Sequence, residues 1–130
     1  VHAVVPVDLT IPGCPVDRGQ LLEVIESVLV GRTPRQFNHP VCVECKLNDT
    51  VCVVEAYGQM CMGPVTRAGC GAICPGRGDT CEGCRGLLPD GNFASHQQML
   101  AEHGNPPEEI RLRYLMFNAY RCEELGVPLP

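Results

Sequence analysis

The chain has 130 residues, a formal net charge of −5 at pH 7 and only six aromatic residues, none of them Trp. This size fits one small domain or part of a larger one, and so few large side chains do not predict a self-sufficient hydrophobic core. The negative charge and the single lysine, Lys46, argue against nucleic acid or an anionic membrane as partner, because phosphate groups are recognised by positive surfaces. No apolar run reaches the length of a membrane span.

The first thirty residues are predicted to contain a strand and a helix. Residues 2–11 are rich in apolar side chains and predict a buried strand, which the Gly-Cys-Pro turn at 13–15 ends. Asp17 is the predicted N-cap of a helix, and Gly31 is its predicted C-terminal stop. The apolar face of that helix is Leu21, Val24, Ile25, Val28 and Leu29. A strand, a tight turn and an amphipathic helix make half of a βαβ unit.

Eight of the ten cysteines lie between residues 42 and 84, at Cys42, Cys45, Cys52, Cys61, Cys70, Cys74, Cys81 and Cys84. One CxxC pair opens this stretch and another closes it, with several glycines and prolines between them. The strand-like residues Val51, Val53 and Val54 are its only short apolar run. Because such a segment buries little apolar surface, we expect the cysteines to hold it together. Eight thiols divide evenly into two sets of four.

Three kinds of cysteine chemistry fit this pattern. A disulfide framework is typical of small secreted domains, but no leader-like segment opens the sequence, and CxxC pairs favour a shared metal. Structural zinc sites use similar pairs, usually two tight pairs per ion. Iron–sulfur clusters accept one tight pair and two scattered ligands, because their iron corners take thiolates from different directions. The spacing alone leaves zinc and iron–sulfur clusters equally open.

The sequence after Cys84 predicts two helices. Ser95 and Gln98 form a capping-box pattern for a helix that runs to Gly104. Asn105 is the predicted N-cap of a second helix, with Pro106 at its first position. One face of this helix combines Ile110, Tyr114, Phe117 and Arg121, and we expect it to pack on the cysteine-rich region or on a partner. Structural or surface roles are predicted for His96 and His103, and a thiol without a ligand role for Cys122.

Four motifs in order resemble the small, electron-transfer subunit of nickel–iron hydrogenases. They are GCP at 13–15, CVEC at 42–45, CMGPVTRAGC at 61–70 and CEGC at 81–84. The tail from His96 to Glu123, with MFNAY at 116–120, looks most similar to the cytoplasmic, NADP-linked hydrogenase or sulfhydrogenase branch. The resemblance covers nearly the whole chain and only the C-terminal part of the family's sequence. The resemblance favours iron–sulfur clusters over zinc.

The resemblance implies a role for nine cysteines. Cys42, Cys45, Cys52 and Cys61 match the ligands of the distal cluster, and Cys70, Cys74, Cys81 and Cys84 match the medial one. Cys14 matches the fourth ligand of the proximal cluster, whose other three ligands belong to an upstream flavodoxin-like part of the family. The best-known pattern has proline in place of Cys74 and binds [3Fe–4S], so a fourth thiolate here implies [4Fe–4S] and a lower potential. Many relatives use histidine at the first distal position, but His39 is expected to lie beside the ligands or at the surface.

The resemblance also implies an architecture. The expected fold is α plus irregular, a Cys-rich iron–sulfur domain with few strands and about three helices. Its expected parts are 1–31, the end of a flavodoxin-like domain; 32–93, the two-cluster domain; and 94–130, a helical segment. Arg67 and Arg85 are expected either to neutralise cluster charge or to be solvated at the surface.

The expected activity is electron transfer in the cytoplasm. The implied partners are a large subunit carrying the nickel–iron site and flavin- or NAD(P)-binding and further iron–sulfur subunits. No nucleophile–base pair or dinucleotide-binding fingerprint predicts bond chemistry by the chain itself. Two other functions stay open from the residues: a zinc-stapled interaction module without a redox role, and a ferredoxin-like carrier acting free in solution.

Overall fold

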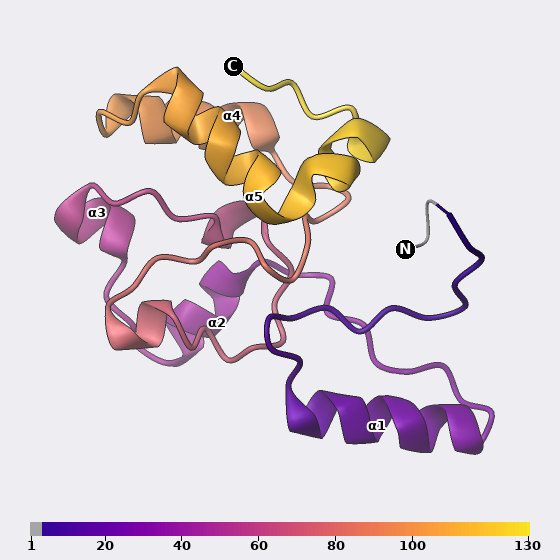
Figure 1. Cartoon of the computed structure of the whole chain (residues 1–130). Helices are drawn as coiled ribbons and strands as arrows, with labels where there is room; N and C mark the ends of the chain where they lie inside the picture. The colour runs from indigo at the N-terminus through magenta and orange to yellow at the C-terminus, as the bar shows by residue number, and fades with distance from the viewer. Residues whose placement is uncertain (1–3) are drawn as a thin grey trace. The chain divides into compact units, whose positions relative to one another are not determined.

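A computed structural model describes residues 4–130 (Figure 1). Its helices are α1 (Arg18–Leu29), α2 (Val41–Leu47), α3 (Val53–Tyr57), η1 (Gly63–Val65), η2 (Pro75–Arg77), α4 (Phe93–Glu102) and α5 (Pro107–Leu125). Within the described residues, β structure is limited to two isolated bridges, Pro40 with Arg67 and Thr66 with Leu87. The prediction of a helical and irregular fold with few strands is confirmed, although the chain has more helices than the three expected. None of the helices in residues 4–130 has the length and apolar character of a membrane span.

The chain divides into an N-terminal unit, Val1–Gln36, and a cysteine-rich unit, Phe37–Pro130. In the N-terminal unit the predicted strand is wrong over residues 4–11, which form no strand, and Val4 is 86% exposed. Residues 2 and 3 of that prediction lie outside the described residues. A strand needs a neighbour to pair its backbone groups, and the described part of this unit offers none.

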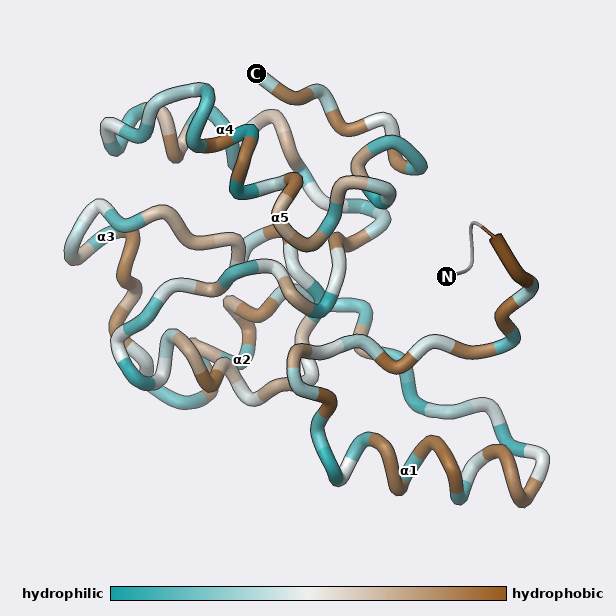
Figure 2. Tube along the Cα trace, viewed as in Figure 1, coloured by the Kyte–Doolittle hydropathy of each residue, from teal (hydrophilic) through white to brown (hydrophobic). Residues whose placement is uncertain are grey.

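Helix α1 begins and ends where the sequence predicts. The side chain of Asp17 accepts a hydrogen bond from the backbone N–H of Gln20 (2.8 Å). At the other end, Gly31 has a φ of +67°, and the N–H of Arg32 donates to the carbonyl of Ser27, which together close the helix with a Schellman motif. The predicted apolar face is mostly exposed in this unit: of its five residues only Val24 is buried, and hydrophobic residues continue along α1 in Figure 2.

The cysteine-rich unit has one hydrophobic core between its loops and its last two helices. Met62 and Val65 from the η1 region pack there with Leu87, Leu100 from α4 and Tyr114 from α5, all fully buried. Helix α4 contacts both α5 and η1, and α2 contacts η1. The core therefore joins the helices directly to the segment that follows Cys61.

The apolar run at residues 51–54 is not a strand. Val53 and Val54 open the short helix α3 and are both buried in the core. Gly58 ends this helix with a φ of +64°, so the helix has only five residues. Two adjacent β-branched residues favour strands on propensity, but here their burial against the core decides the local structure.

The last two helices form, but with different caps from those predicted. Asn92 is the N-cap of α4, and its side chain accepts from the N–H of Ser95 (3.1 Å), so the Ser95 capping box is wrong. Asn105 does not cap α5. Its side-chain amide donates to the carbonyl of Leu100 (2.8 Å) near the end of α4, while Pro106 precedes α5. In both places the asparagine side chain forms a hydrogen bond with a backbone group three to five residues away, and this bond replaces the predicted cap.

The buried face of α5 consists of Ile110, Tyr114, Asn118 and Cys122. Of the four residues predicted for this face, Phe117 is instead 47% exposed, and Arg121 is half-buried. Asn118 has non-helical angles (φ −127°, ψ 20°) and kinks the helix. Asn118 and Cys122 thus lie on the core in place of Phe117 and Arg121. The expectation that this helix packs on the cysteine-rich region is confirmed.

Candidate metal centre

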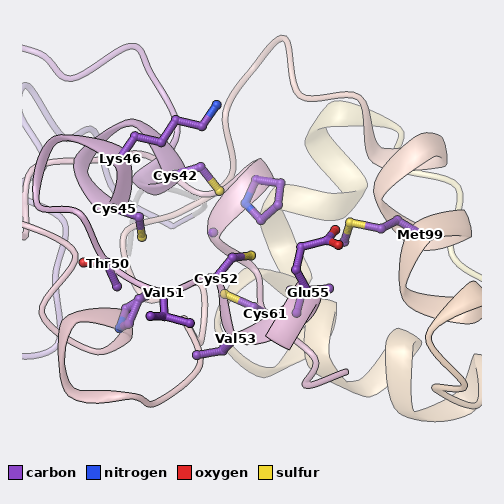
Figure 3. A pocket seen from close by; sticks show the side chains of 14 residues that line it. Cys42, Cys45, Lys46, Thr50, Val51, Cys52, Val53, Glu55, Cys61 and Met99 are labelled. Atoms are coloured by element: carbon purple, nitrogen blue, oxygen red, sulfur yellow. The ribbon is translucent and has the colours of Figure 1, made fainter. Parts of the chain in front are cut away.

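The first four cysteines of the cysteine-rich unit surround one pocket. Cys42 and Cys45 project from α2, Cys52 is the N-cap of α3, and Cys61 lies just before η1. All four line a pocket with a volume of about 150 Å³, which is also bordered by Met99 from α4 (Figure 3). His39 is not among the lining residues. Its ring packs edge-on against Phe37, with centroids 6.0 Å apart. The four cysteines that the resemblance groups together thus line the same pocket.

The electrostatics of the pocket reflect how close these thiols lie. Burial, followed by the neighbouring thiols of Cys61, Cys45 and Cys52, raises the pKa of the Cys42 thiol to about 12. Burial also raises the pKa of Cys45 and of Cys61. Four adjacent sulfurs cannot all carry negative charge without a compensating cation. A bound metal reverses this balance, because it holds the thiols as thiolates.

The second set, Cys70, Cys74, Cys81 and Cys84, comes from two loops. Cys70 and Cys74 lie on the segment that leads into η2, and Cys81 and Cys84 lie on the segment that follows it. Burial raises the pKa of Cys81 to about 12, and the thiols of Cys61 and then Cys70 add to the increase. Burial first, and then the thiols of Cys84 and Cys70, raises the pKa of Cys74. Cys74 therefore lies near two other thiols of its set, and Cys81 lies near one thiol of each set.

The sulfurs are spread around a space rather than drawn to a single point. Within residues 4–130, no three His, Cys, Asp or Glu side chains converge closely enough to hold one metal ion. The pocket of the first set, at about 150 Å³, is about ten times the roughly 10–15 Å³ of cavity that holds one water. Thiolate donors select zinc, copper(I) and iron–sulfur clusters.

The two sets are joined by a hydrogen bond between their buried members. The backbone N–H of Cys81 donates to the sulfur of Cys61, with 3.3 Å between nitrogen and sulfur. The N–H of Met62 in turn donates to the carbonyl of Cys81 (2.9 Å). The hydroxyl of Thr66 donates to the carbonyl of Met62 (2.7 Å) and fixes this crossing. A ligand candidate of one set thus contacts the backbone of a ligand candidate of the other.

Helices α4 and α5 hold the loops that carry the buried cysteines. The ring of His96 is buried, and its Nε2 lies 3.0 Å from the carbonyl oxygen of Cys61. Because a carbonyl only accepts, Nε2 carries the hydrogen. Burial lowers the pKa of His96 and keeps the ring neutral, so Nδ1 accepts from the Tyr114 hydroxyl (2.6 Å). The structural role predicted for His96 is confirmed.

The second set has a matching contact from α5. The side-chain amide of Asn118 donates to the carbonyl of Gly83 (3.1 Å), which lies between Cys81 and Cys84. Asn118 is the residue at the helix kink. No local pattern in the sequence indicates this contact, because the two residues are 35 positions apart.

Glu44 is a further residue that the sequence did not single out. It lies on α2 between Cys42 and Cys45, and its carboxylate accepts from the backbone N–H of Gly69 (2.7 Å) and of Ala72 (3.1 Å). These two residues flank Cys70 of the second set. An acidic residue inside a CxxC motif is the only sequence signal that points to it.

The remaining predicted residues have different surroundings. Cys14 is exposed in the N-terminal unit, and Cys122 is buried, with its thiol donating to the carbonyl of Tyr114 (3.9 Å). Arg85 is buried, and its Nε donates to the carbonyl of Ala68 (2.7 Å), so its assignment as a solvated surface residue is wrong. Arg67 is half-buried, and burial lowers the pKa of its guanidinium.

Sequence comparison relates the chain to hydrogenase subunits, although no protein-family model matches it. It is 42% identical to the delta subunit of sulfhydrogenase 2 from Pyrococcus furiosus, over 87% of this chain and 47% of that protein. It is 34% identical to a subunit of the vhu F420-non-reducing hydrogenase of Methanocaldococcus jannaschii, over 89% of this chain and 47% of that protein. A third relative is the iron–sulfur subunit of an F420-non-reducing hydrogenase from Archaeoglobus profundus, 28% identical over 68% of this chain and 36% of that protein.

The chain thus spans about half the length of the first two of these relatives, 47% of each. The similarity supports a hydrogenase iron–sulfur subunit, and ten cysteines in 130 residues agree with a thiolate-bound cofactor.

Proposed function

We propose that this chain is the iron–sulfur, electron-transfer part of a nickel–iron hydrogenase small subunit. In this proposal Cys42, Cys45, Cys52 and Cys61 bind the distal cluster, and Cys70, Cys74, Cys81 and Cys84 bind the medial one, each as [4Fe–4S]. Cys14 contributes one ligand to a proximal cluster. The proposal is supported by the resemblance to hydrogenase subunits and by the two sets of thiols in the cysteine-rich unit.

The first set offers the donors that an iron–sulfur cluster uses. Thiolates bind zinc as well, and the resemblance to hydrogenase iron–sulfur subunits favours the cluster. The iron corners of a cubane take thiolates from different directions, which suits four cysteines around a pocket of about 150 Å³. The four cysteines in its lining supply the donors that such a cluster uses.

The observation that carries a relay function is the contact between the two sets. When bound, an iron–sulfur cluster takes up and releases single electrons. The N–H of Cys81 donates to the sulfur of Cys61, so one short covalent and hydrogen-bonded path connects a ligand of each set. Both cysteines are buried. Met62 and Thr66 are buried and form hydrogen bonds beside this contact. A path that is shielded from water has a lower reorganisation energy when its charge changes.

In the proposed complex, H₂ is oxidised in another subunit. Oxidation of one H₂ at the nickel–iron site of a large subunit yields two protons and two electrons. The electrons pass one at a time through the cysteine-rich unit to a flavin- and NAD(P)-binding partner, in the cytoplasm. This assignment follows the resemblance of the tail at 96–123 to the NADP-linked branch, and one relative is itself a sulfhydrogenase subunit.

Metal analysis tests the proposal. The protein is purified anaerobically with whatever copurifies, and iron, sulfide and zinc are measured beside the visible spectrum. We expect a brown protein with about eight iron per chain, or about twelve if the proximal cluster is also present. Cys42→Ala and Cys81→Ala should each lose about four iron, whereas Cys122→Ser, the control, should lose none. A colourless protein with about two zinc per chain would overturn the electron-transfer function.

The cluster type has its own test. With Cys74 as fourth ligand, the medial cluster should be [4Fe–4S], and the untreated protein should lack the EPR signal of an oxidised [3Fe–4S] cluster. A strong signal of that kind in the protein as isolated would show that Cys74 is not a ligand.

A further inference from the structure

Helix α2, which carries two cysteines of the first set, also holds the loop that carries a cysteine of the second set. The carboxylate of Glu44 accepts from the N–H groups of Gly69 (2.7 Å) and Ala72 (3.1 Å). Asn48, which follows the helix, donates its side-chain amide to the carbonyl of Gly71 (3.0 Å). Three hydrogen bonds from α2 and the residue after it thus hold residues 69–72, which include Cys70.

The loop needs such contacts because its backbone is strained. Gly69 has a φ of +112° and Gly71 a φ of +66°, conformations that glycine adopts readily. Ala72, which is not glycine, has a φ of +52° and is fully buried. A left-handed conformation in a residue with a Cβ persists only when its surroundings enforce it. The bond from the Ala72 N–H to Glu44 is one such constraint.

Glu44 also places negative charge beside a predicted ligand. Its second carboxylate oxygen lies 3.8 Å from the sulfur of Cys70, whose thiol donates to it. Among the described residues, the ion pairs involve other acids, and neither lysine nor arginine pairs with Glu44. When Cys70 binds metal it loses its proton, and the Glu44 carboxylate then faces a thiolate. Such a charge disfavours the uptake of an electron nearby and lowers the reduction potential.

The hydrogen bonds act in the same direction. Backbone N–H groups that point at cluster sulfurs raise the potential of a cluster, because they stabilise its more negative, reduced state. The N–H groups of Gly69 and Ala72 are instead directed at the Glu44 carboxylate. The loop on either side of Cys70 therefore has two fewer donors to offer a bound cluster.

We propose that Glu44 positions the Cys70 ligand and keeps the reduction potential of the second cluster low, acting from the helix that carries Cys42 and Cys45. The inference rests on the proposed function, since it concerns a cluster held by the second set. It makes α2 a shared support of both sets, so that one helix both supplies ligands to one site and shapes the other.

The test uses Glu44→Gln and Glu44→Ala in the anaerobically purified protein with its copurifying partners. Glu109→Gln is the matched control, because Glu109 is an exposed carboxylate on α5 that does not line the pocket of the first set. Three readouts are compared: iron per chain, EPR-monitored redox titration, and amide hydrogen exchange at Gly69 and Ala72. Cys42→Ala should lose the first cluster, so the signal missing from its EPR spectrum identifies the first cluster and helps to assign that of the second.

Glu44→Gln should keep about eight iron per chain but shift the midpoint potential of the second cluster upward and speed exchange at Ala72, because an amide carries no charge and has one acceptor oxygen. The Glu44→Ala variant should contain about four fewer iron atoms per chain, because it should lose the second cluster. Glu109→Gln should leave the second cluster's potential and the exchange of the loop unchanged.

Two failures are distinguishable. Wild-type iron, potential and exchange in both Glu44 variants would overturn the role of Glu44 and leave the relay function standing. A wild-type protein without iron would refute the proposed function and with it the tuning of a potential, whereas exchange at Gly69 and Ala72 would still decide whether Glu44 positions the loop.

Discussion

The contact between Tyr114 and His96 allows a prediction with a defined magnitude. Tyr114→Phe removes one hydroxyl while keeping nearly the same shape, and it leaves Nδ1 of the buried His96 ring without a donor. Burial raises the pKa of Tyr114 above its ordinary value, so in the wild type the hydroxyl stays protonated and can donate. A buried acceptor that loses its partner costs about 1–3 kcal/mol.

That cost is large enough to measure by thermal unfolding. For a unit of this size, about 1 kcal/mol lowers the midpoint by roughly 4–8 °C, so Tyr114→Phe should unfold about 5 °C or more below the wild type. Tyr57→Phe is the control, because Tyr57 is 66% exposed on α3, and its midpoint should not move. Unfolding is followed by circular dichroism under anaerobic conditions at one scan rate, because bound metal makes the transition scan-dependent. Equal midpoints for the two variants would refute a buried hydrogen bond at His96.

Two further substitutions test how the cysteine loops are held. Gly69→Ala should destabilise the unit by about 1–3 kcal/mol, because a residue with a Cβ is strained at a φ of +112° and its Cβ would also crowd Arg85 and Phe37. Gly76→Ala has open space around its Cβ and should stay within about 0.5 kcal/mol of the wild type in the same unfolding experiment. Asn118→Ala should cost about 1–2 kcal/mol and make the second cluster more easily lost to an iron chelator, because the carbonyl of Gly83 loses its donor. Chelation at the wild-type rate would contradict that role for Asn118.

Local signals in the sequence predicted local structure well. Asp17 and Gly31 mark the ends of α1, because a cap depends only on residues within one turn of it. The helices α2 and α3 escaped prediction because seven and five residues are too few to show a helical period. The cap of α4 was misplaced because Asn92 and Ser95 are both plausible N-caps that sequence alone cannot rank. The cap of α5 was misplaced because the Asn105 side chain bonds to Leu100 instead.

In the candidate site, too, the residues with a local sequence signal could be predicted and the others could not. The eight cysteines between residues 42 and 84 were grouped by the resemblance of their motifs, and the first four line one pocket. The residues that hold them could not be found. His96 reaches Cys61 across 35 positions, and Glu44 reaches Gly69 across 25. Contacts of that range depend on how the whole unit packs, and a single sequence carries no pattern for them.

These long-range contacts explain how a unit with so small a core can keep its cysteines in place. Polar side chains from the helices hold the loops that carry buried or half-buried cysteines: Glu44 beside Cys70, His96 at Cys61 and Asn118 at Gly83. Two of these side chains are neutral and one is anionic. Arg85 adds a cationic contact, because its buried guanidinium donates to the carbonyl of Ala68 in the loop of Cys70. The charges that such contacts place beside the sulfurs act on the reduction potential of whatever the sulfurs bind, as well as on the order of the ligands.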